Sequence, residues 1–362
     1  MQASQSLAPG DARPDEQAAM QAAATLYHRY FTGLILTVVT RRGRDDAAEL
    51  MFRVFRHQHH EKFLPGLRKL GLAGMPDAVA AAGYHYLANR VGGVQVEFMR
   101  ESDRKAWVRF VPPRWVYDGT AIAGVPGEVS RGVLRGWYAQ NGPSLGNPRL
   151  GFVCTAQTME GQYGLAGYFL EHDRELAPDE RLRFAPGEEP PPFDPAAAPV
   201  LDSGEWTPDR LAKANRNYAM DYVRSTLPRM AELFGPADTA YLGGIAGQLI
   251  AMQYHQETAA LLGVQGDGPE AFAQYMAGMA RGQGDDCTWA RDGDAVLVRQ
   301  TGWRLMRGLA PLHPAVFDAW NGLWQGALMV HDRFLCLEVL QRMDHGDPAF
   351  VWRIRRRRTQ TF

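Results

Sequence analysis

The sequence has few cysteines, which argues against a fold held together by disulfides. Only Cys154, Cys287 and Cys336 occur among 362 residues, and none of them belongs to a CxxC pair. An odd number of widely spaced cysteines does not fit a disulfide framework. We expect Cys154 and Cys336, which lie in apolar runs, to be small buried hydrophobic residues.

The sequence also lacks an excess of charge, a membrane-spanning run and a secretion signal. Its formal net charge is −1, and its one basic block, residues 355–358, is expected to be a solvated terminus. The apolar run at residues 31–39 is too short to cross a bilayer. Residues 1–21 lack the basic and apolar regions of a signal peptide. We therefore expect a cytoplasmic protein that binds neither nucleic acid nor a membrane.

Motifs with a strong chemical meaning are missing as well. The sequence contains no phosphate-binding GxxxxGK[ST] loop, no HExxH zinc motif and no EF-hand. The letters Gly142-x-Ser144-x-Gly146 match a nucleophile elbow, which needs a strand before the serine and a helix after it. A predicted helix precedes this serine and Pro148 follows it, so we interpret the match as chance.

What the sequence does contain is a mixed pattern of helices and strands that occurs twice. Hydrophobic residues make up 46% and charged residues 22%, as in globular proteins, and the length suits two domains. Helical spacing and period-two alternation predict helices at residues 21–40, 45–72, 77–90 and 127–139, and strands at 94–99, 106–111, 150–155 and 164–172. In the second half they predict helices at 207–226, 236–262, 269–281 and 314–330, and strands at 287–290, 295–301 and 349–354, while 334–343 fits either type.

The repeated order indicates an internal duplication, in which His57 pairs with His255, Trp115 with Trp303 and Cys154 with Cys336. The fold class is therefore α+β, with two tandem domains that each pack helices on an antiparallel sheet. We place the domains at residues 21–187 and 206–362, after a disordered tail at 1–20 and on either side of a proline-rich linker at 188–205.

The second half resembles a known superfamily in the order of its motifs. Four segments carry the likeness: residues 317–326, 334–338, 346–348 and 350–352. In this order they are similar to the 4-vinyl-reductase-type ligand-binding domain and to L-2-amino-thiazoline-4-carboxylic acid hydrolase-like proteins. The resemblance implies a deep, mostly apolar pocket for a small organic molecule.

The same resemblance also bears on a metal site. Some members of the superfamily hold zinc with a Glu-x-x-Cys pair and a further cysteine. Here Glu338 is present, but Gln341 and Ala349 stand where the thiolates would be. Zinc requires about four nitrogen, sulfur or oxygen ligands. We therefore expect no such zinc site, and the sequence identifies no other cofactor.

The densest group of reactive side chains is His57-Gln58-His59-His60-Glu61. On a helix His57, His60 and Glu61 share one face, and the second half offers His255 and Glu257. These residues are our candidates for general acid–base catalysis, with metal binding and a plain exposed helix face as the alternatives.

A second repeated pattern joins an arginine to a tryptophan. Arg114-Trp115 and Trp303-Arg304 each follow a predicted strand, and could clamp a planar carboxylate by stacking and by a bidentate guanidinium contact. Trp324 is a further candidate for the pocket wall. The alternative is that the tryptophans are core residues and the arginines lie on the surface.

These observations favour an enzyme that acts on a small heterocyclic or aromatic acid. The simplest reaction is hydrolytic cleavage of a C–N or C–S bond with a histidine as general base. One alternative is a non-catalytic protein that binds a small molecule, and another is a metal-dependent oxygenase or lyase. A homodimer is possible, because domains of this superfamily often pair.

Overall fold

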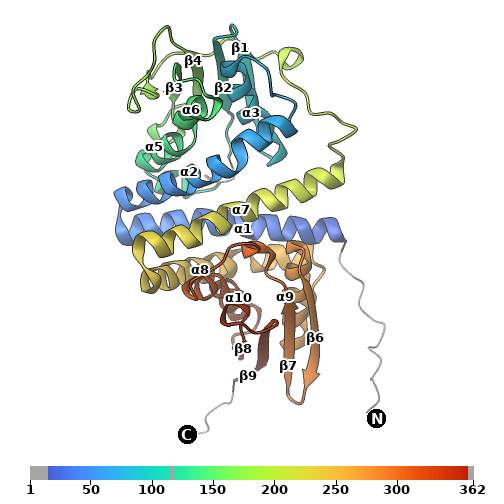
Figure 1. Cartoon of the computed structure of the whole chain (residues 1–362). Helices are drawn as coiled ribbons and strands as arrows, with labels where there is room; N and C mark the ends of the chain where they lie inside the picture. Colours follow the sequence, from blue (N-terminus) through green and yellow to red (C-terminus); the bar gives the residue numbers. More distant parts are fainter. Residues whose placement is uncertain (1–14, 115–117, 358–362) are drawn as a thin grey trace.

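The computed structural model describes residues 15–114 and 118–357, and it shows an α+β protein in two parts. The first half contains α1 (Glu16–Arg42), α2 (Arg44–Lys69), α3 (Asp77–Val91), β1 (Val96–Arg100), β2 (Lys105–Phe110), α4 (Ala121–Gly124), α5 (Gly127–Gly136), α6 (Asn141–Leu145), β3 (Leu150–Ala156), β4 (Leu165–Glu171) and β5 (Leu182–Phe184). The second half contains α7 (Pro208–Phe234), α8 (Pro236–Leu261), α9 (Pro269–Gln283), β6 (Asp286–Asp292), β7 (Ala295–Thr301), α10 (Ala315–His331), β8 (Leu335–Gln341) and β9 (Phe350–Arg356). The long helices α1, α2, α7 and α8 lie between the two sheets (Figure 1).

The two sheets have the same strand order, and each consists mainly of antiparallel strands. The first sheet has the order β1-β2-β4-β3, with β5 added in parallel to β3, and the second has the order β6-β7-β9-β8. The segment at residues 334–343, which fitted a helix or a strand, forms β8 and pairs with β9. This confirms the predicted α+β class with two antiparallel-rich sheets.

The first residues of the helices and strands define which residues correspond in the two halves. The starts of α1, α2 and α3 (residues 16, 44 and 77) each precede those of α7, α8 and α9 (residues 208, 236 and 269) by 192 residues. The starts of β3 and β4 (residues 150 and 165) precede those of β8 and β9 (residues 335 and 350) by 185 residues.

This correspondence corrects the pairing that we made from residue types. His57 lies at the position of Leu249, whereas His255 lies at the position of Phe63. Cys154 likewise corresponds to Val339 and not to Cys336. The physical reason is that equivalent backbone positions in the two halves carry side chains of different chemistry. Pairing residues of the same type therefore gave the wrong correspondence.

Local signals explain the ends of the long helices. Gly43 and Gly235 have φ angles of 99° and 83°, which favour glycine, and each separates two long helices. The side chain of Asp15 accepts a hydrogen bond from the backbone of Gln17 and caps α1. The helix therefore begins at Glu16, so residues 16–20 are helical and do not belong to the predicted tail.

The two halves exchange their first helices. Helix α1 packs on the second half, where the Tyr27 hydroxyl accepts a 2.8 Å hydrogen bond from Trp320 Nε1. The Tyr30 hydroxyl lies 3.0 Å from the carbonyl oxygen of Gly243 and 2.9 Å from that of Ala319. Helix α7 packs in return on α2 and α3 of the first half. Each half therefore buries a helix that the other half supplies.

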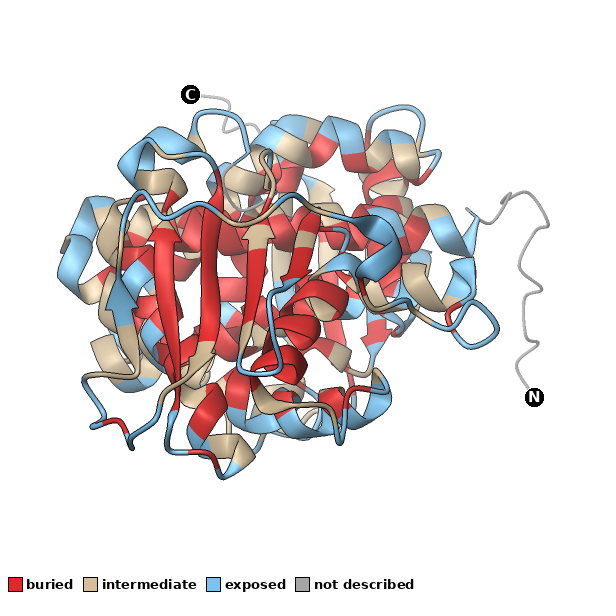
Figure 2. Ribbon diagram, turned by 90° about the horizontal axis from the view of Figure 1, so that it is seen from above, coloured by how far each residue is buried: buried red, intermediate tan, exposed pale blue. Residues whose placement is uncertain are grey.

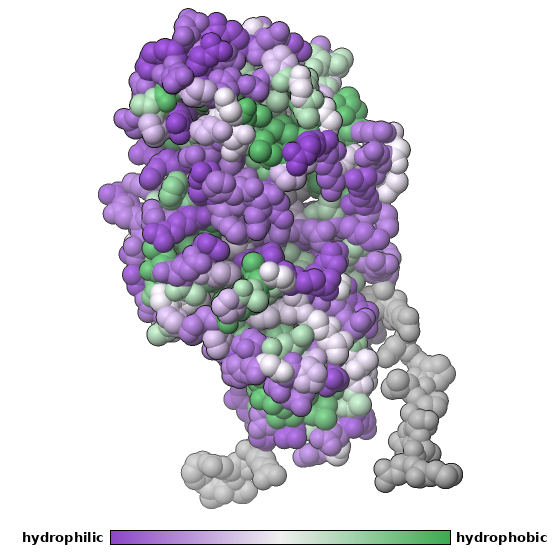
Figure 3. Space-filling model, in the orientation of Figure 1, coloured by the Kyte–Doolittle hydropathy of each residue, from purple (hydrophilic) through white to green (hydrophobic). Residues whose placement is uncertain are grey.

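The proline-rich segment between the halves covers part of the first sheet. Phe193 packs on an apolar cluster that includes Trp107, Val153 and Tyr168 on the outer face of this sheet. The strands of this sheet are largely buried in the view from above (Figure 2). In Figure 3 most of the visible face is hydrophilic, and its apolar residues lie in separate patches. Among the described residues, no helix combines the length and apolar character needed to cross a membrane.

Candidate functional site

A cavity of about 490 Å³ lies in the first half, between α2, α3, α5 and the exchanged helix α7. Its walls are mainly apolar and aromatic. They include Phe31, Ile35, Met51, Phe55, Tyr84, Val91, Phe110, Val129, Val133, Trp137, Tyr138 and Leu165. A volume of this size and an apolar lining are typical of sites for small organic ligands. Because α7 forms one wall, the cavity is complete only when the two halves are joined.

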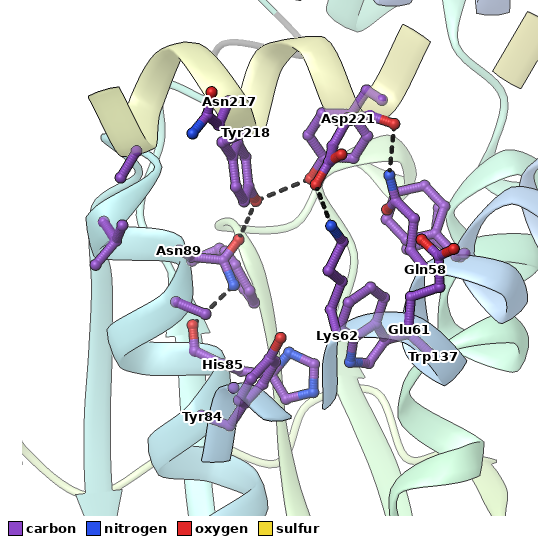
Figure 4. Close-up of a pocket in the computed structure, with 18 of the residues that line it drawn as sticks. Gln58, Glu61, Lys62, Tyr84, His85, Asn89, Trp137, Asn217, Tyr218 and Asp221 are labelled. Atoms are coloured by element: carbon purple, nitrogen blue, oxygen red, sulfur yellow. Dashed lines mark hydrogen bonds and ion pairs between the residues drawn. The ribbon is translucent and has the colours of Figure 1, made fainter. Parts of the chain in front are cut away.

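A chain of hydrogen bonds crosses from α7 to α3 on the cavity wall (Figure 4). The Tyr222 hydroxyl donates to the Tyr218 hydroxyl at 2.8 Å, and the Tyr218 hydroxyl donates to Asn89 Oδ1 at 2.8 Å. Asn89 Nδ2 then donates to the carbonyl oxygen of His85 at 2.8 Å. Burial raises the pKa of both tyrosines above the usual value, so their hydroxyls stay protonated at neutral pH.

His85 is a buried imidazole in the same wall, and only 3% of its surface is exposed. Its ring stacks on Tyr138 with 4.0 Å between centroids, and its Nε2 lies 3.1 Å from Asn141 Nδ2. Burial holds the pKa of His85 well below the usual value. His85 is therefore neutral at pH 7, and it can offer a hydrogen bond but little basicity.

The rim of the cavity is charged and comes from α2 and α7. Its exposed members are Glu61, Lys62, Pro65, Lys69, Lys213 and Asn217. Lys62 Nζ forms an ion pair at 2.8 Å with Asp221, which ties the two helices together across the opening (Figure 4). Gln58 adds hydrogen bonds to the carbonyl oxygen of Asp221 and to Ser225 Oγ, both at 3.2 Å.

The corresponding space in the second half is filled by side chains. Trp320, Trp324, Trp352 and Phe317 are at most 1% exposed and pack against one another there. Two polar residues of the cavity also have apolar counterparts, since His85 corresponds to Ala277 and Tyr218 to Leu26. Leu165 of the cavity corresponds to the larger Phe350. His85 and Tyr218 therefore accompany the open cavity, and the second half folds without a polar side chain at either position.

The predicted histidine cluster on α2 lies beside the cavity, and only part of it reaches the rim. Glu61 lines the opening, and its Oε1 lies 3.5 Å from Nε2 of the half-buried His57. His60 is exposed on the helix surface. The buried member is His59, whose Nε2 lies 2.9 Å from Ser144 Oγ and whose ring stacks on Phe63. Burial lowers the pKa of His59 to about 3, so it is neutral.

The predicted residues of the second half lie away from this cavity. His255 is buried, with its Nε2 3.2 Å from His331 Nδ1, and Glu257 is exposed. Trp303 and Trp324 belong to the aromatic core that fills the second half. The backbone N–H of Arg304 donates to Asp285 at 2.9 Å.

Arg114 is a predicted contact that the structure does place at the cavity. It lines the cavity, and its guanidinium carbon lies 4.4 Å from the centre of the Phe110 ring. Trp115, its predicted partner, lies outside the described residues. Among the residues that the structure does describe, no group of three or more His, Cys, Asp or Glu side chains could hold a metal ion.

Sequence reasoning did not select His85, Asn89 or Tyr218 as site residues. Each lies on a helix face with apolar neighbours, where a single polar side chain is usually a hydrogen-bonded core residue. A comparison of the two halves at a constant shift of 192 residues would have revealed His85 and Tyr218, because Ala277 and Leu26 stand at the equivalent positions. When the chain is compared with known protein families, curated proteins and solved structures, it matches none of them.

Proposed function

We propose that the first half binds a small organic acid with a flat apolar body, and that it does so in the cavity between α2, α3, α5 and α7. The observation that carries this proposal is the cavity itself, with about 490 Å³ of space behind a rim that bears three lysines. The resemblance to 4-vinyl-reductase-type domains is carried by the second half, and it supports the proposal through the strand order that the two halves share.

The chemistry of the wall favours binding over catalysis by a buried histidine. A general base works best when its pKa lies near the working pH. The pKa of His85 lies well below its ordinary value because the ring is buried. The phenols of Tyr218 and Tyr222 stay protonated, so the wall offers hydrogen bonds and aromatic surface and no strong base.

Ligand binding can be tested with an aromatic acid as the probe. We expect 1-naphthoate to raise the melting temperature and to quench tryptophan fluorescence, because Trp137 lines the cavity. A ligand at 100 times its Kd stabilises a protein by about 2.7 kcal/mol. The variant Ala88→Trp, which fills the cavity from α3, is expected to abolish both effects. Unchanged binding by this variant would show that the cavity is not the site.

Hydrolysis of the bound acid is the second candidate function, and one observation favours it. Glu61 stands on the rim with His57 3.5 Å away, so a carboxylate and an imidazole could together activate a water molecule at the opening. A heterocyclic acid found by binding would be incubated with the protein, with Glu61→Gln and with His57→Gln. Turnover by the native protein that both variants lose supports this candidate, and binding without turnover rejects it.

A further inference from the structure

Lysine is rare in this chain, and it is concentrated at the cavity. Of the 39 lysines and arginines, only four are lysines: Lys62, Lys69, Lys105 and Lys213. Three of these four line the cavity. Arginine supplies almost all of the formal positive charge elsewhere. The choice of lysine at this one opening therefore calls for a chemical reason.

The three lysines approach the opening from both sides. Lys62 and Lys69 are seven residues apart on α2, about two helical turns, so they lie on the same side of that helix. Lys213 lies on α7 across the opening. The ammonium of Lys69 and the guanidinium of Arg210 lie 5.2 Å and 4.4 Å from the centre of the Trp206 ring.

The lining of the cavity carries more positive than negative charge. Among the described lining residues, five are cations, namely Lys62, Lys69, Arg114, Arg210 and Lys213, and two are carboxylates, namely Glu61 and Asp221. The surplus is three positive charges, whereas the whole chain has a formal charge of −1. Asp209 and Glu205 pair with Lys213 and Arg210 at 3.1 Å and 3.6 Å, but both carboxylates are more than half exposed. Exposed pairs of this kind contribute little and exchange readily.

Lysine differs from arginine in how it meets an anion. Its ammonium is a compact point charge on a flexible stem, whereas the guanidinium of arginine is a planar fork. Several flexible ammonium groups can close around a small, highly charged group without a fixed geometry. A tetrahedral phosphate or a pair of adjacent carboxylates is such a group.

We propose that Lys62, Lys69 and Lys213 bind the dianionic head of an amphipathic ligand whose flat apolar body fills the cavity. This inference rests on the proposed binding function and adds the charge and position of the head group. A phosphate monoester and a vicinal dicarboxylate share this chemistry. The apolar walls hold the body, and the lysines hold the head at the solvent-facing rim.

The test compares four probes that share a naphthalene body: 1-naphthyl phosphate, naphthalene-1,2-dicarboxylate, 1-naphthoate and 1-naphthol. Titration calorimetry at low salt is expected to give tighter binding for a dianion than for the monoanion, and for the monoanion than for the neutral alcohol. The tighter of the two dianions identifies the head group. Affinities for both dianions no higher than that for 1-naphthoate would overturn the inference, and tighter binding of 1-naphthoate than of 1-naphthol would then still support the proposed binding of an acid. No binding by any probe would overturn both.

Variants of the lysines provide the second measurement. Lys69→Gln and Lys213→Gln are each expected to weaken binding of the preferred dianion roughly tenfold, with little change for naphthol. Lys105→Gln is the matched control, because Lys105 lies on β2 and pairs with Glu101 away from the cavity. A variant at the rim that binds the dianion as tightly as Lys105→Gln does would contradict the proposal.

Chemical labelling uses the scarcity of lysine directly. An amine-reactive acetylating ester followed by peptide mass spectrometry reports on all four lysines in one experiment. The preferred dianion is expected to slow labelling of Lys62, Lys69 and Lys213, and to leave Lys105 unaffected. Equal labelling of all four lysines with and without a bound dianion would show that the head group lies elsewhere.

Discussion

The hydroxyl of Tyr218 donates a 2.8 Å hydrogen bond to Asn89 Oδ1, and this contact joins the exchanged helix α7 to α3 at the cavity wall. We expect Tyr218→Phe to lower the free energy of unfolding by about 1–2 kcal/mol, because Asn89 loses its donor. The variant should also bind 1-naphthoate more weakly, since Tyr218 lines the cavity.

Tyr30→Phe is the matched control for that substitution. The Tyr30 hydroxyl bonds to two backbone carbonyl groups in the second half, at the position that corresponds to Tyr222. Urea unfolding should show a similar loss of stability, while calorimetry should show unchanged binding. Weakened binding in the Tyr30 variant alone would contradict this assignment of roles.

A reciprocal pair of substitutions tests why only one half has a cavity. Leu165→Phe introduces the residue that the second half carries at Phe350. We expect it to weaken ligand binding at least about tenfold, because the larger ring enters the space of the ligand, with a change in stability of less than about 1 kcal/mol.

The reverse change, Phe350→Leu, removes volume from a fully buried site in the second half. It should lower the free energy of unfolding by roughly 1–2 kcal/mol and leave ligand binding unchanged. Chemical unfolding and calorimetry on both variants measure the two effects separately. Binding that responds to Phe350→Leu as strongly as to Leu165→Phe would reject the assignment of the site to the first half.

The buried His255, whose Nε2 lies beside the half-buried His331, predicts a loss of stability in acid. Burial lowers the pKa of His255 from 6.5 to about 4, and His331 adds to the shift. Below pH 6.5 the unfolded chain therefore binds a proton that the folded protein does not accept until about pH 4. The contribution of neutral His255 to stability is fully present above pH 6.5. The free energy of unfolding then decreases by about 3 kcal/mol in all as the pH falls to 4.

His255→Phe places in α8 the residue that α2 has at the equivalent position, Phe63. The free energy of unfolding is measured in urea at pH 7 and at pH 4.5 for the variant and for the native protein. The decrease between pH 7 and pH 4.5 should be smaller in the variant by about 2–3 kcal/mol. An identical pH dependence in the two proteins would show that His255 is not the group that titrates.

The close contact between α8 and α10 depends on several glycines, and Gly322 is one of them. A Cβ added at Gly322 would lie 2.4 Å from the carbonyl oxygen of Gly244, so Gly322→Ala should destabilise the protein by about 1–3 kcal/mol. Gly244→Ala is the control on the facing helix, because its Cβ would meet no atom closer than 3.8 Å. Alanine is also the better helix former by about 1 kcal/mol. Thermal unfolding should therefore show opposite shifts for the two variants.

Much of the secondary structure could be predicted from local patterns. The helix that starts at Pro236 and the strand at residues 295–301 follow from the spacing of apolar residues and from turn signals close to them in the chain. The segment that forms β8 could not be assigned, because its burial depends on pairing with β9. The pairing of His57 with His255 was wrong by six residues, since it relied on residue types without the lengths of the helices.

The sequence by itself determined the class of the protein and the repeated order of its elements, because periodicity records which side of each helix or strand is buried. The sequence also shows that lysine is rare, but it does not show that three of the four lysines line one cavity. Only the tertiary structure decided that α1 and α7 change places, and that the first half stays open while Trp320 and Phe350 fill the second. A cavity is the difference between the volume that several distant segments enclose and the volume that their side chains occupy. No local pattern contains that difference, because residues such as Lys69 and Lys213 line the same cavity only when the chain has folded.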